Sequence, residues 1–349
     1  MARRQTRPLM IGKVQIGGGA PVAVQSMTNT DTRDSEATIN QINMLAGAGC
    51  EIVRVAVPDQ AAAAELPVIL RSITIPLIAD VHFDYRLALT ALEAGVHGLR
   101  INPGNIGGRA KVAEVTAAAK DKGIPIRIGV NAGSLEKPLL AKYGGVTAAA
   151  MVESALNHIR MLEEYNFTDI KVSLKASSIP LMVEAYRTLA KSVDYPFHIG
   201  VTEAGTLSTG AVKSAVGIGI LLNEGLGDTV RVSLTGNPVH EVKVAYDILK
   251  ALGLRRRGVD FISCPTCGRT QVDLIKIAEE TETRLKKLDR PIKVAVMGCV
   301  VNGPGEAREA DVGIACGKGE GLIFKKGLVV RKVPEAKLVD ELMREIENL

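Results

Sequence analysis

The chain has 349 residues, of which 46% are hydrophobic, and this is enough for a large core and about two domains. No apolar run approaches the ~20 residues that span a bilayer, and the basic start lacks a signal peptide's apolar stretch, so we expect a cytoplasmic protein without a membrane anchor. The net charge is +5, but aromatic residues are only 3% and Trp is absent, which leaves little for stacking on single-stranded bases, and a small acidic ligand explains the charge as well as nucleic acid does.

The first part of the chain alternates short β-branched runs with Ala- and Leu-rich amphipathic stretches. The runs predict strands at Pro21–Met27, Glu51–Val57, Pro76–Val81, His97–Asn102, Pro125–Asn131, Asp169–Ala176, Pro196–Ala204 and Thr229–Gly236. A helical stretch follows each run, the last at about Val239–Leu252. Strand–helix units of this number and regularity predict an α/β fold, a (β/α)8 barrel over residues 1–253. An open, doubly wound sheet is the main alternative, but no GxGxxG motif follows the first strand.

The pattern changes after a short polar connector at Leu254–Asp260. Next we expect a helix whose first turn lies near Cys267, and then a strand at Ile292–Gly298. Further strands are expected at Asp311–Cys316 and within Gly321–Val333, the latter with a hairpin turn at Lys-Lys-Gly. A final helix runs from Pro334 to about Glu347. These elements predict a small α+β domain over residues 254–349.

The cysteines indicate a metal site. Cys264 and Cys267 form a CxxC pair, and Cys299 opens the loop CVVNGPGE, whose Gly and Pro residues restrain its path. The five cysteines are odd in number and sparse, which argues against a disulfide framework. Thiolates select zinc, Cu(I) or iron–sulfur clusters, and the expected helix N-terminus after Cys267 would stabilise a thiolate.

A fourth ligand is needed beside these three thiolates, and the residues alone leave two candidates. Cys316 lies in a strand-like run, where a buried core cysteine is the commoner interpretation. Glu306 follows the NGPG turn, and its carboxylate would complete a [4Fe–4S] cluster in which one iron has an oxygen ligand. A structural zinc site closed by Cys or His remains the alternative.

A second site is predicted at the carboxyl ends of the barrel strands. Basic residues in buried strands are costly unless they reach the barrel mouth and meet a partner. Such residues are Arg54, Arg100, Arg127, Lys175 and Arg231, with Lys171 a weaker candidate. Because Arg127, Gly129 and Asn131 alternate, they share one face of their strand. Converging cations of this kind predict a polyanionic ligand such as a diphosphate.

Carboxylate and neutral groups accompany these cations. Glu203, in VTEAG, is the candidate proton donor or hydroxyl anchor, and Asp80 and His82 are weaker candidates. Neutral hydrogen bonds are expected from Ser26, Thr28, Asn29 and Asn131.

At this point the residues resemble a known family. The motifs SCPTCGR, MGCVVNGPGEA, QSMTNTDT, DVHFD, RINPGNI, IGVNAG, SLKAS, VTEAG and SLTG are similar to those of 4-hydroxy-3-methylbut-2-enyl diphosphate synthases, in their shorter bacterial form. The resemblance implies a [4Fe–4S] cluster on Cys264, Cys267, Cys299 and Glu306. It also implies a diphosphate held by the five basic residues named above, with Glu203 as the active-site carboxylate.

The resemblance further implies an oxidoreductase of isoprenoid precursor biosynthesis. Its reaction is the two-electron reductive ring opening and dehydration of 2-C-methyl-D-erythritol 2,4-cyclodiphosphate, with flavodoxin or ferredoxin as the electron donor. The eighth helix delivers the chain to the barrel bottom and the connector is short. We therefore expect a homodimer in which each cluster domain caps the partner's barrel, as the family's dimer implies. The rival hypotheses are a metal-binding sensor of a phosphorylated metabolite and a non-redox barrel synthase with structural zinc.

Overall fold

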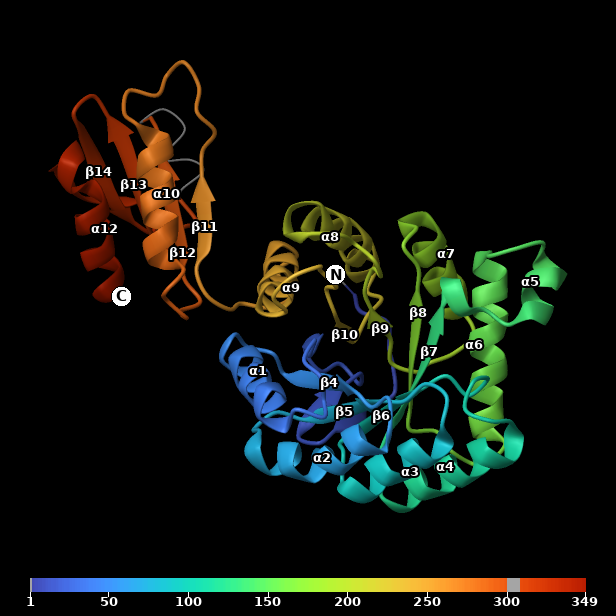
Figure 1. The fold of residues 1–349 in the computed structure, drawn as a ribbon. Coiled ribbons are helices and arrows are strands. Elements are labelled where there is room, and N and C mark those ends of the chain that lie inside the picture. The colour runs from blue at the N-terminus through green and yellow to red at the C-terminus, as the bar shows by residue number, and fades with distance from the viewer. Residues whose placement is uncertain (1, 300–307) are drawn as a thin grey trace. The chain divides into compact units, whose positions relative to one another are not determined.

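The computed structural model describes residues 2–299 and 308–349. The chain forms two compact units, Met1–Arg255 and Arg256–Leu349, and each has its own hydrophobic core (Figure 1). Within the described residues, no helix combines the length and apolar character that a membrane span requires.

The first unit is a parallel barrel, as predicted. Its strands are β3 (Ala23–Met27), β4 (Ile52–Ala56), β5 (Leu77–Asp80), β6 (Gly98–Ile101), β7 (Ile126–Asn131), β8 (Ile170–Lys175), β9 (His198–Ile199) and β10 (Thr229–Val230). They form one 8-stranded sheet in the order β8-β7-β6-β5-β4-β3-β10-β9. A parallel bridge between Val172 and Phe197 links β8 to the residue before β9, so the sheet is nearly closed.

Helices surround these strands in Figure 1. They are α1 (Ser35–Gly47), α2 (Gln60–Ser72), α3 (Tyr85–Ala94), α4 (Arg109–Asp121), α5 (Lys137–Tyr143), α6 (Ala148–Glu163), α7 (Ile179–Leu189), α8 (Leu207–Asn223) and α9 (Val239–Ala251). Side-chain caps start several of them. In each case the capping side chain accepts a hydrogen bond from the backbone N–H three residues later, which would otherwise lack a partner in the first turn. The capping residues are Asp34, Asp59 and Thr147.

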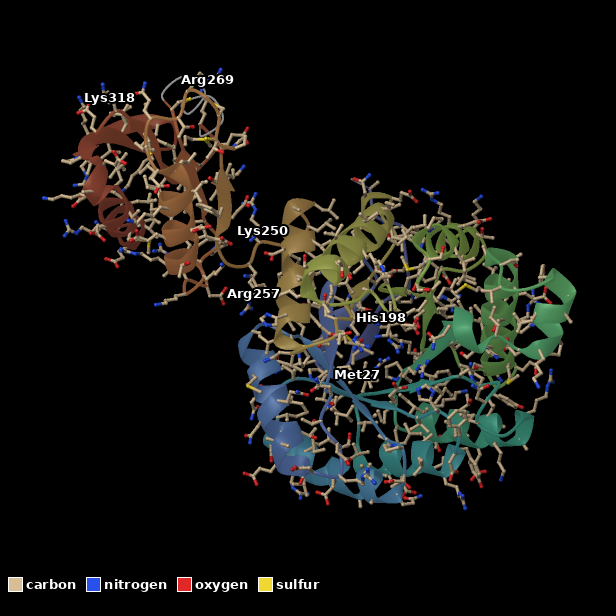
Figure 2. The ribbon with its side chains drawn as sticks, turned by 45° about the horizontal axis from the view of Figure 1, so that its top comes forward. Met27, His198, Lys250, Arg257, Arg269 and Lys318 are labelled. Carbon is tan, nitrogen blue, oxygen red and sulfur yellow. The ribbon has the colours of Figure 1, made fainter. Side chains whose placement is uncertain are left out.

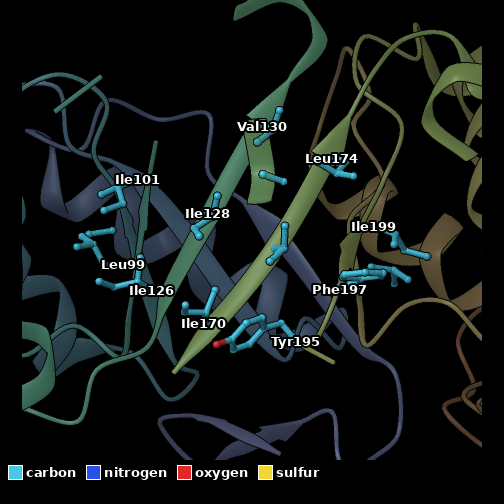
Figure 3. Packing of buried hydrophobic residues seen from close by; sticks show 14 of the residues in the cluster. Leu99, Ile101, Ile126, Ile128, Val130, Ile170, Leu174, Tyr195, Phe197 and Ile199 are labelled. Carbon is cyan, nitrogen blue, oxygen red and sulfur yellow. The ribbon is translucent and has the colours of Figure 1, made fainter. Parts of the chain in front are cut away.

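The strands bury apolar side chains outward and polar side chains inward. Ile126, Ile128 and Val130 of β7 belong to the core between sheet and helices (Figure 3). Because side chains alternate along a strand, Arg127 and Asn131 point into the barrel. The predicted alternation in this strand is confirmed.

A short hairpin at the amino ends of the barrel strands was not predicted. It consists of β1 (Leu9–Ile11) and β2 (Val14–Ile16). Ile11 and Ile16 pack against Ile52 and Ile78, which lie near the starts of β4 and β5. The hairpin therefore closes the barrel bottom with apolar side chains and leaves the polar interior open toward the strands' carboxyl ends.

The second unit is a mixed sheet with helices. Its elements are β11 (Asp260–Ser263), α10 (Leu274–Leu285), β12 (Lys293–Met297), β13 (Val312–Gly317), β14 (Glu320–Lys325), β15 (Leu328–Pro334) and α12 (Leu338–Glu347). The 5-stranded sheet has the order β11-β12-β13-β14-β15. The first three strands are parallel, and the last two join by antiparallel pairing. The predicted hairpin is confirmed, because Lys326 and Gly327 between β14 and β15 both have positive φ.

Two expectations for this unit were wrong. The residues Asp260–Ser263 form the edge strand β11, whereas Asp260 was assigned to a connector. The helix begins at Leu274, with Asp273 as its N-cap, and not near Cys267. The intervening residues include Gly268 and Thr270, which favour turns over helix.

Two glycines of α8 give a stability test of the close packing around β9. A Cβ at Gly217 would lie 2.6 Å from the Val201 side chain, whereas a Cβ at Gly219 would meet no atom within 4 Å. We expect Gly217→Ala to lower the free energy of unfolding by about 1–3 kcal/mol through overpacking. Gly219→Ala should raise it by about 0.5–1 kcal/mol, because alanine favours the helix. Urea unfolding followed by circular dichroism measures both, and equal shifts would contradict this packing.

Candidate functional site

The predicted basic residues do converge inside the barrel, where they lie on its strands or just past them. Arg54, Arg100, Arg127 and Lys175 are each at least nine-tenths buried, and Arg231, just past β10, is partly exposed. Repulsion among them is direct: Arg127 is acted on by Arg54, Arg100 and Arg231, and Lys175 by all four arginines. The structure therefore brings all five together in one barrel.

Asp80, at the end of β5, lies at the centre of this group. Its Oδ1 is 2.9 Å from Arg100 Nη1, and its Oδ2 is 3.5 Å from Arg54 Nε. His82 Nε2 is 3.3 Å from Oδ1. Burial alone would raise the pKa of Asp80, but Arg54, His82 and Arg100 hold it well below its ordinary value. Asp80 is thus an ionised carboxylate that orients two of the arginines, a larger role than the sequence analysis gave it.

A second buried carboxylate comes from helix α9 and was missed. Glu241 accepts hydrogen bonds from Ser26 Oγ at 2.9 Å and from the Leu234 amide at 2.9 Å. Arg231 Nη2 lies 3.6 Å from the same carboxylate. The signal was its periodicity: Glu241 occupies the apolar face of α9 four residues before Ala245. A charge on that face needs a buried partner.

These two carboxylates do not satisfy the cations. Within residues 2–299 and 308–349, Arg127 Nε and Nη1 are buried without a hydrogen-bond partner, and so is Arg100 Nε. Burial lowers the pKa of Arg54 to about 10 and that of Arg127 well below its ordinary value, and neighbouring cations contribute. Buried, unpartnered guanidinium groups at a barrel mouth fit an anionic ligand with several oxygens.

A glycine and a methionine accommodate two of the guanidinium groups. A Cβ at Gly129 would lie 2.6 Å from Arg100 Nε, so the glycine lets this side chain cross β7. Arg54 Nη2 lies 2.9 Å from the sulfur of Met27, its register partner on β3. Figure 2 shows Met27 and His198 within the ring of strands. The interior thus holds large polar side chains where most barrels hold aliphatic ones.

The neutral candidates take different positions. Ser26 is engaged by Glu241, and Thr28 Oγ1 is buried with no partner among the described residues. Asn29 is exposed and exchanges hydrogen bonds with Gln41, and its side chain also donates to the Gly236 carbonyl at 3.4 Å. Asn131, the last residue of β7, is partly exposed at the mouth.

Glu203 lies in the loop after β9, not at a strand end. Its side chain is exposed, and no hydrogen bond joins it to the part of the chain that the structure describes. Its φ of 53° is in the left-handed region, which is uncommon outside glycine and asparagine. Such backbone conformations persist where surrounding structure enforces them and are concentrated at functional sites.

Cys264 and Cys299 follow the carboxyl ends of β11 and β12, respectively. Because these strands are parallel neighbours, Cys264 after β11 lies beside Gly298 and Cys299 after β12. The Gly298 amide donates a hydrogen bond to Cys264 Sγ at 3.1 Å. The Cys267 turn is closed by a hydrogen bond from the Thr270 amide to the Cys267 carbonyl at 2.9 Å. Since α10 starts later, its N-terminus does not act on Cys267 as expected.

The donor chemistry of these loops suits a soft metal. None of the cysteines forms a disulfide, and an amide donating to sulfur stabilises a thiolate ligand. Cys316 is fully buried in β13, and burial raises the pKa of its thiol to about 12, so it is a core residue. Glu306 lies outside the described residues. Within those residues, no three His, Cys, Asp or Glu side chains form a complete metal site.

Comparison with solved structures identifies the same barrel architecture in other enzymes. Dihydropteroate synthase from Yersinia pestis aligns with a TM-score of 0.52 at 12% identity, covering 71% of this chain and 99% of that one. N-acetylneuraminic acid synthetase from Leptospira borgpetersenii gives a TM-score of 0.52 at 14% identity, covering 81% and 98%. At such identities these matches concern the fold alone.

Sequence comparison extends over both units. Residues 6–246 match the model of the GcpE TIM-barrel domain, and residues 260–348 match that of the GcpE protein C-terminal domain. A Geobacter sulfurreducens protein named 4-hydroxy-3-methylbut-2-en-1-yl diphosphate synthase (flavodoxin) is 64% identical over 347 residues, covering 99% of this chain and 98% of its own. A Clostridium acetobutylicum protein of the same name is 62% identical over 349 residues, covering 100% of both chains. The chain, with its cation-lined barrel and its cysteine loops, therefore belongs to the GcpE family.

Proposed function

We propose that this chain is a 4-hydroxy-3-methylbut-2-en-1-yl diphosphate synthase. It converts 2-C-methyl-D-erythritol 2,4-cyclodiphosphate into the linear allylic diphosphate by two-electron reduction and loss of water, a step that supplies isoprenoid precursors. The observation that carries this proposal is the buried Arg127, whose Nε and Nη1 have no hydrogen-bond partner among the described residues and which lies among other cations inside the barrel. Two relatives that match the full chain at 62–64% identity carry this name.

The basic residues hold the cyclic diphosphate and stabilise its charge as the ring opens. Arg54, Arg100, Arg127, Lys175 and Arg231 supply the donors. The diphosphate is also the leaving group at the carbon that is reduced, so the same cations stabilise the negative charge that develops on its oxygen. Asp80 keeps Arg54 and Arg100 in position.

Neutral polar groups are proposed to orient the rest of the ligand through hydrogen bonds. They are Asn131, Ser26, Thr28 and Asn29. Glu203 is proposed to bind the substrate hydroxyl and to deliver the proton that water needs to leave. Its exposed side chain and left-handed backbone support a role at the open rim, not in the core.

The thiols of the second unit are proposed to hold a [4Fe–4S] cluster. Cys264, Cys267, Cys299 and Glu306 are the ligands, and the Gly298 amide beside Cys264 Sγ fits a bound thiolate. Such a cluster supplies electrons one at a time. The names of the relatives support flavodoxin as the electron donor, and ferredoxin is the alternative.

A homodimer is proposed because the chain leaves the barrel at its bottom. Arg255 donates to the Val22 carbonyl at 2.8 Å and pairs with Glu51 at 3.0 Å, and both partners precede barrel strands. Only residues 256–259 then separate this anchor from β11, and they reach at most about 14 Å. Such a connector favours a cluster domain that serves the barrel of a partner subunit, with two equal sites about a twofold axis.

The cluster assignment predicts how cysteine variants differ. Cys264→Ser, Cys267→Ser and Cys299→Ser should lose the iron–sulfur absorption near ~400 nm and the activity, since serine is a poor ligand for iron in such clusters. Cys316→Ser is the matched control and should keep both, because this thiol lies in the core. Anaerobic purification with iron and sulfide analysis measures the outcome. Bleaching by Cys316→Ser but not by Glu306→Ala would refute the fourth ligand.

The anion assignment predicts weaker substrate binding after charge removal. Arg127→Met and Arg231→Met should each weaken binding by roughly ten- to a hundredfold, as expected for the loss of a charge-assisted hydrogen bond of about 1.5–3 kcal/mol. The cluster spectrum should stay intact. Arg160→Met, on the exposed face of α6, is the control and should bind normally. Unchanged binding in both site variants would exclude the diphosphate site.

The dimer assignment predicts complementation between two inactive variants. Mixing Glu203→Ala with Cys299→Ser, after subunit exchange is demonstrated, should restore about a quarter of the wild-type activity. Half of the dimers are then mixed, and each has one intact barrel facing one intact cluster. Absence of recovery despite exchange would mean that each cluster serves its own barrel.

A further inference from the structure

Below the barrel mouth lies a buried lysine to which the proposed chemistry gives no role. Lys171 is only 1% exposed, and its register partner on β7 is Arg127. It precedes Lys175 on β8 by four residues, so it lies about 13 Å deeper along the strand. Among the described residues, its Nζ has no hydrogen-bond partner.

The groups around Lys171 are positive or already engaged. Arg127 on β7 and Arg54 on β4 both repel its charge. Burial and the same two arginines also lower the pKa of His198 on β9, so its ring is neutral. Among the residues that the structure describes, Asp228, before β10, is the carboxylate that attracts this charge.

Asp228 is occupied by other partners, however. It pairs with Arg3 at 3.2 Å and accepts hydrogen bonds from Thr6 Oγ1 at 3.0 Å and the Phe197 amide at 2.8 Å. On the side of the hairpin, Lys171 and Arg127 line a narrow space whose other walls are apolar or uncharged, with Ile11 and Ile78 among them. This surface offers an ammonium group no counter-ion.

An anion at the mouth changes this balance. Burial and the charge of Arg127 lower the pKa of Lys171 well below its ordinary value. A diphosphate would neutralise Arg127 and Arg54, which removes the repulsion without touching Lys171. Protonation of the lysine then becomes more favourable, and by linkage the proton strengthens anion binding.

We propose that Lys171 is uncharged in the ligand-free protein and takes up a proton when a polyanion occupies the barrel mouth. Lys171 would thus be a positioning residue that acts through Arg127 and adjusts the positive charge of the barrel to its ligand. The inference rests on the diphosphate site proposed above and adds a proton to its binding equilibrium.

Calorimetric titration of the anaerobic holoenzyme with inorganic pyrophosphate tests this. At neutral pH, the binding enthalpy in buffers of different ionisation enthalpy reports the protons taken up. Wild type should show net uptake, to which Lys175 also contributes. Lys171→Met should still bind, with a smaller uptake and a weaker dependence of affinity on pH. Lys243→Met, the same change on the exposed face of α9, should match wild type.

Two results would separate this inference from the proposed site. Binding with the same proton uptake in wild type and Lys171→Met would overturn the role of Lys171 and leave the anion site standing. Failure of wild type to bind either pyrophosphate or the cyclic diphosphate would overturn the anion site itself, and the inference with it.

Stability without ligand provides an independent measurement. The pKa of Lys171 in the folded protein lies below the ~10.4 of an unfolded lysine, so between these values the unfolded chain binds the additional proton. Wild-type stability should therefore rise with pH relative to Lys171→Met across that window. The difference between their urea midpoints should shrink from pH 7 toward pH 10, and a constant difference would contradict an uncharged Lys171.

Discussion

Positive charge buried inside a parallel barrel is the constraint on which the rest of the first unit depends. Arg54, Arg100 and Arg127 stand on three strands of one sheet, β4, β6 and β7, and are buried where water cannot solvate them fully. An unpaired charge in such a place is costly, and the protein offsets the cost only in part, through Asp80 and Glu241. The positive charge that these carboxylates do not neutralise would attract the anionic ligand proposed above. Ligand binding and the electrostatics of the fold are therefore one problem.

Several structural details follow from this constraint. Gly129 leaves space for the Arg100 side chain, and the sulfur of Met27 contacts the guanidinium of Arg54. The apolar hairpin β1–β2 closes the barrel bottom, so the polar interior opens in one direction. The outward faces of the strands stay aliphatic and pack against the helices (Figure 3). A barrel with a polar interior is thus stabilised mainly by the layer between its sheet and its helices.

The second unit also uses parallel strand pairing, here to bring two cysteine loops together. Parallel pairing of β11 and β12 places two cysteine loops side by side, and the Gly298 amide contacts Cys264 Sγ. The antiparallel strands β14 and β15 extend the sheet on its far side, and Cys316 of β13 lies in the core. The buried cations and the cysteine loops are thus built on separate units. The proposed dimer is one way to unite them with a connector of only a few free residues.

Much of the architecture could be read from local patterns. Short β-branched runs located all eight barrel strands. Alternation within β7 placed Arg127 inside, because a period of two is a property of any strand. The Lys-Lys-Gly turn was also predictable from a local pattern, because glycine readily adopts the positive φ that such a turn requires. The start of α10 and the strand β11 were missed, because short segments owe their state to sheet pairing and not to propensity.

The pairing within the site was decided by tertiary structure. Sequence showed which strands carry a cation, but not that Asp80 would bind Arg100, 20 residues away, while Glu203 would stay exposed in a loop. Nor did it show that Glu241 would reach Ser26 across 215 residues. Residue type and spacing determine which groups a strand presents inward. The pairing of each carboxylate with a cation depends on barrel closure. Only closure brings β3, the first barrel strand, beside α9, the last barrel helix.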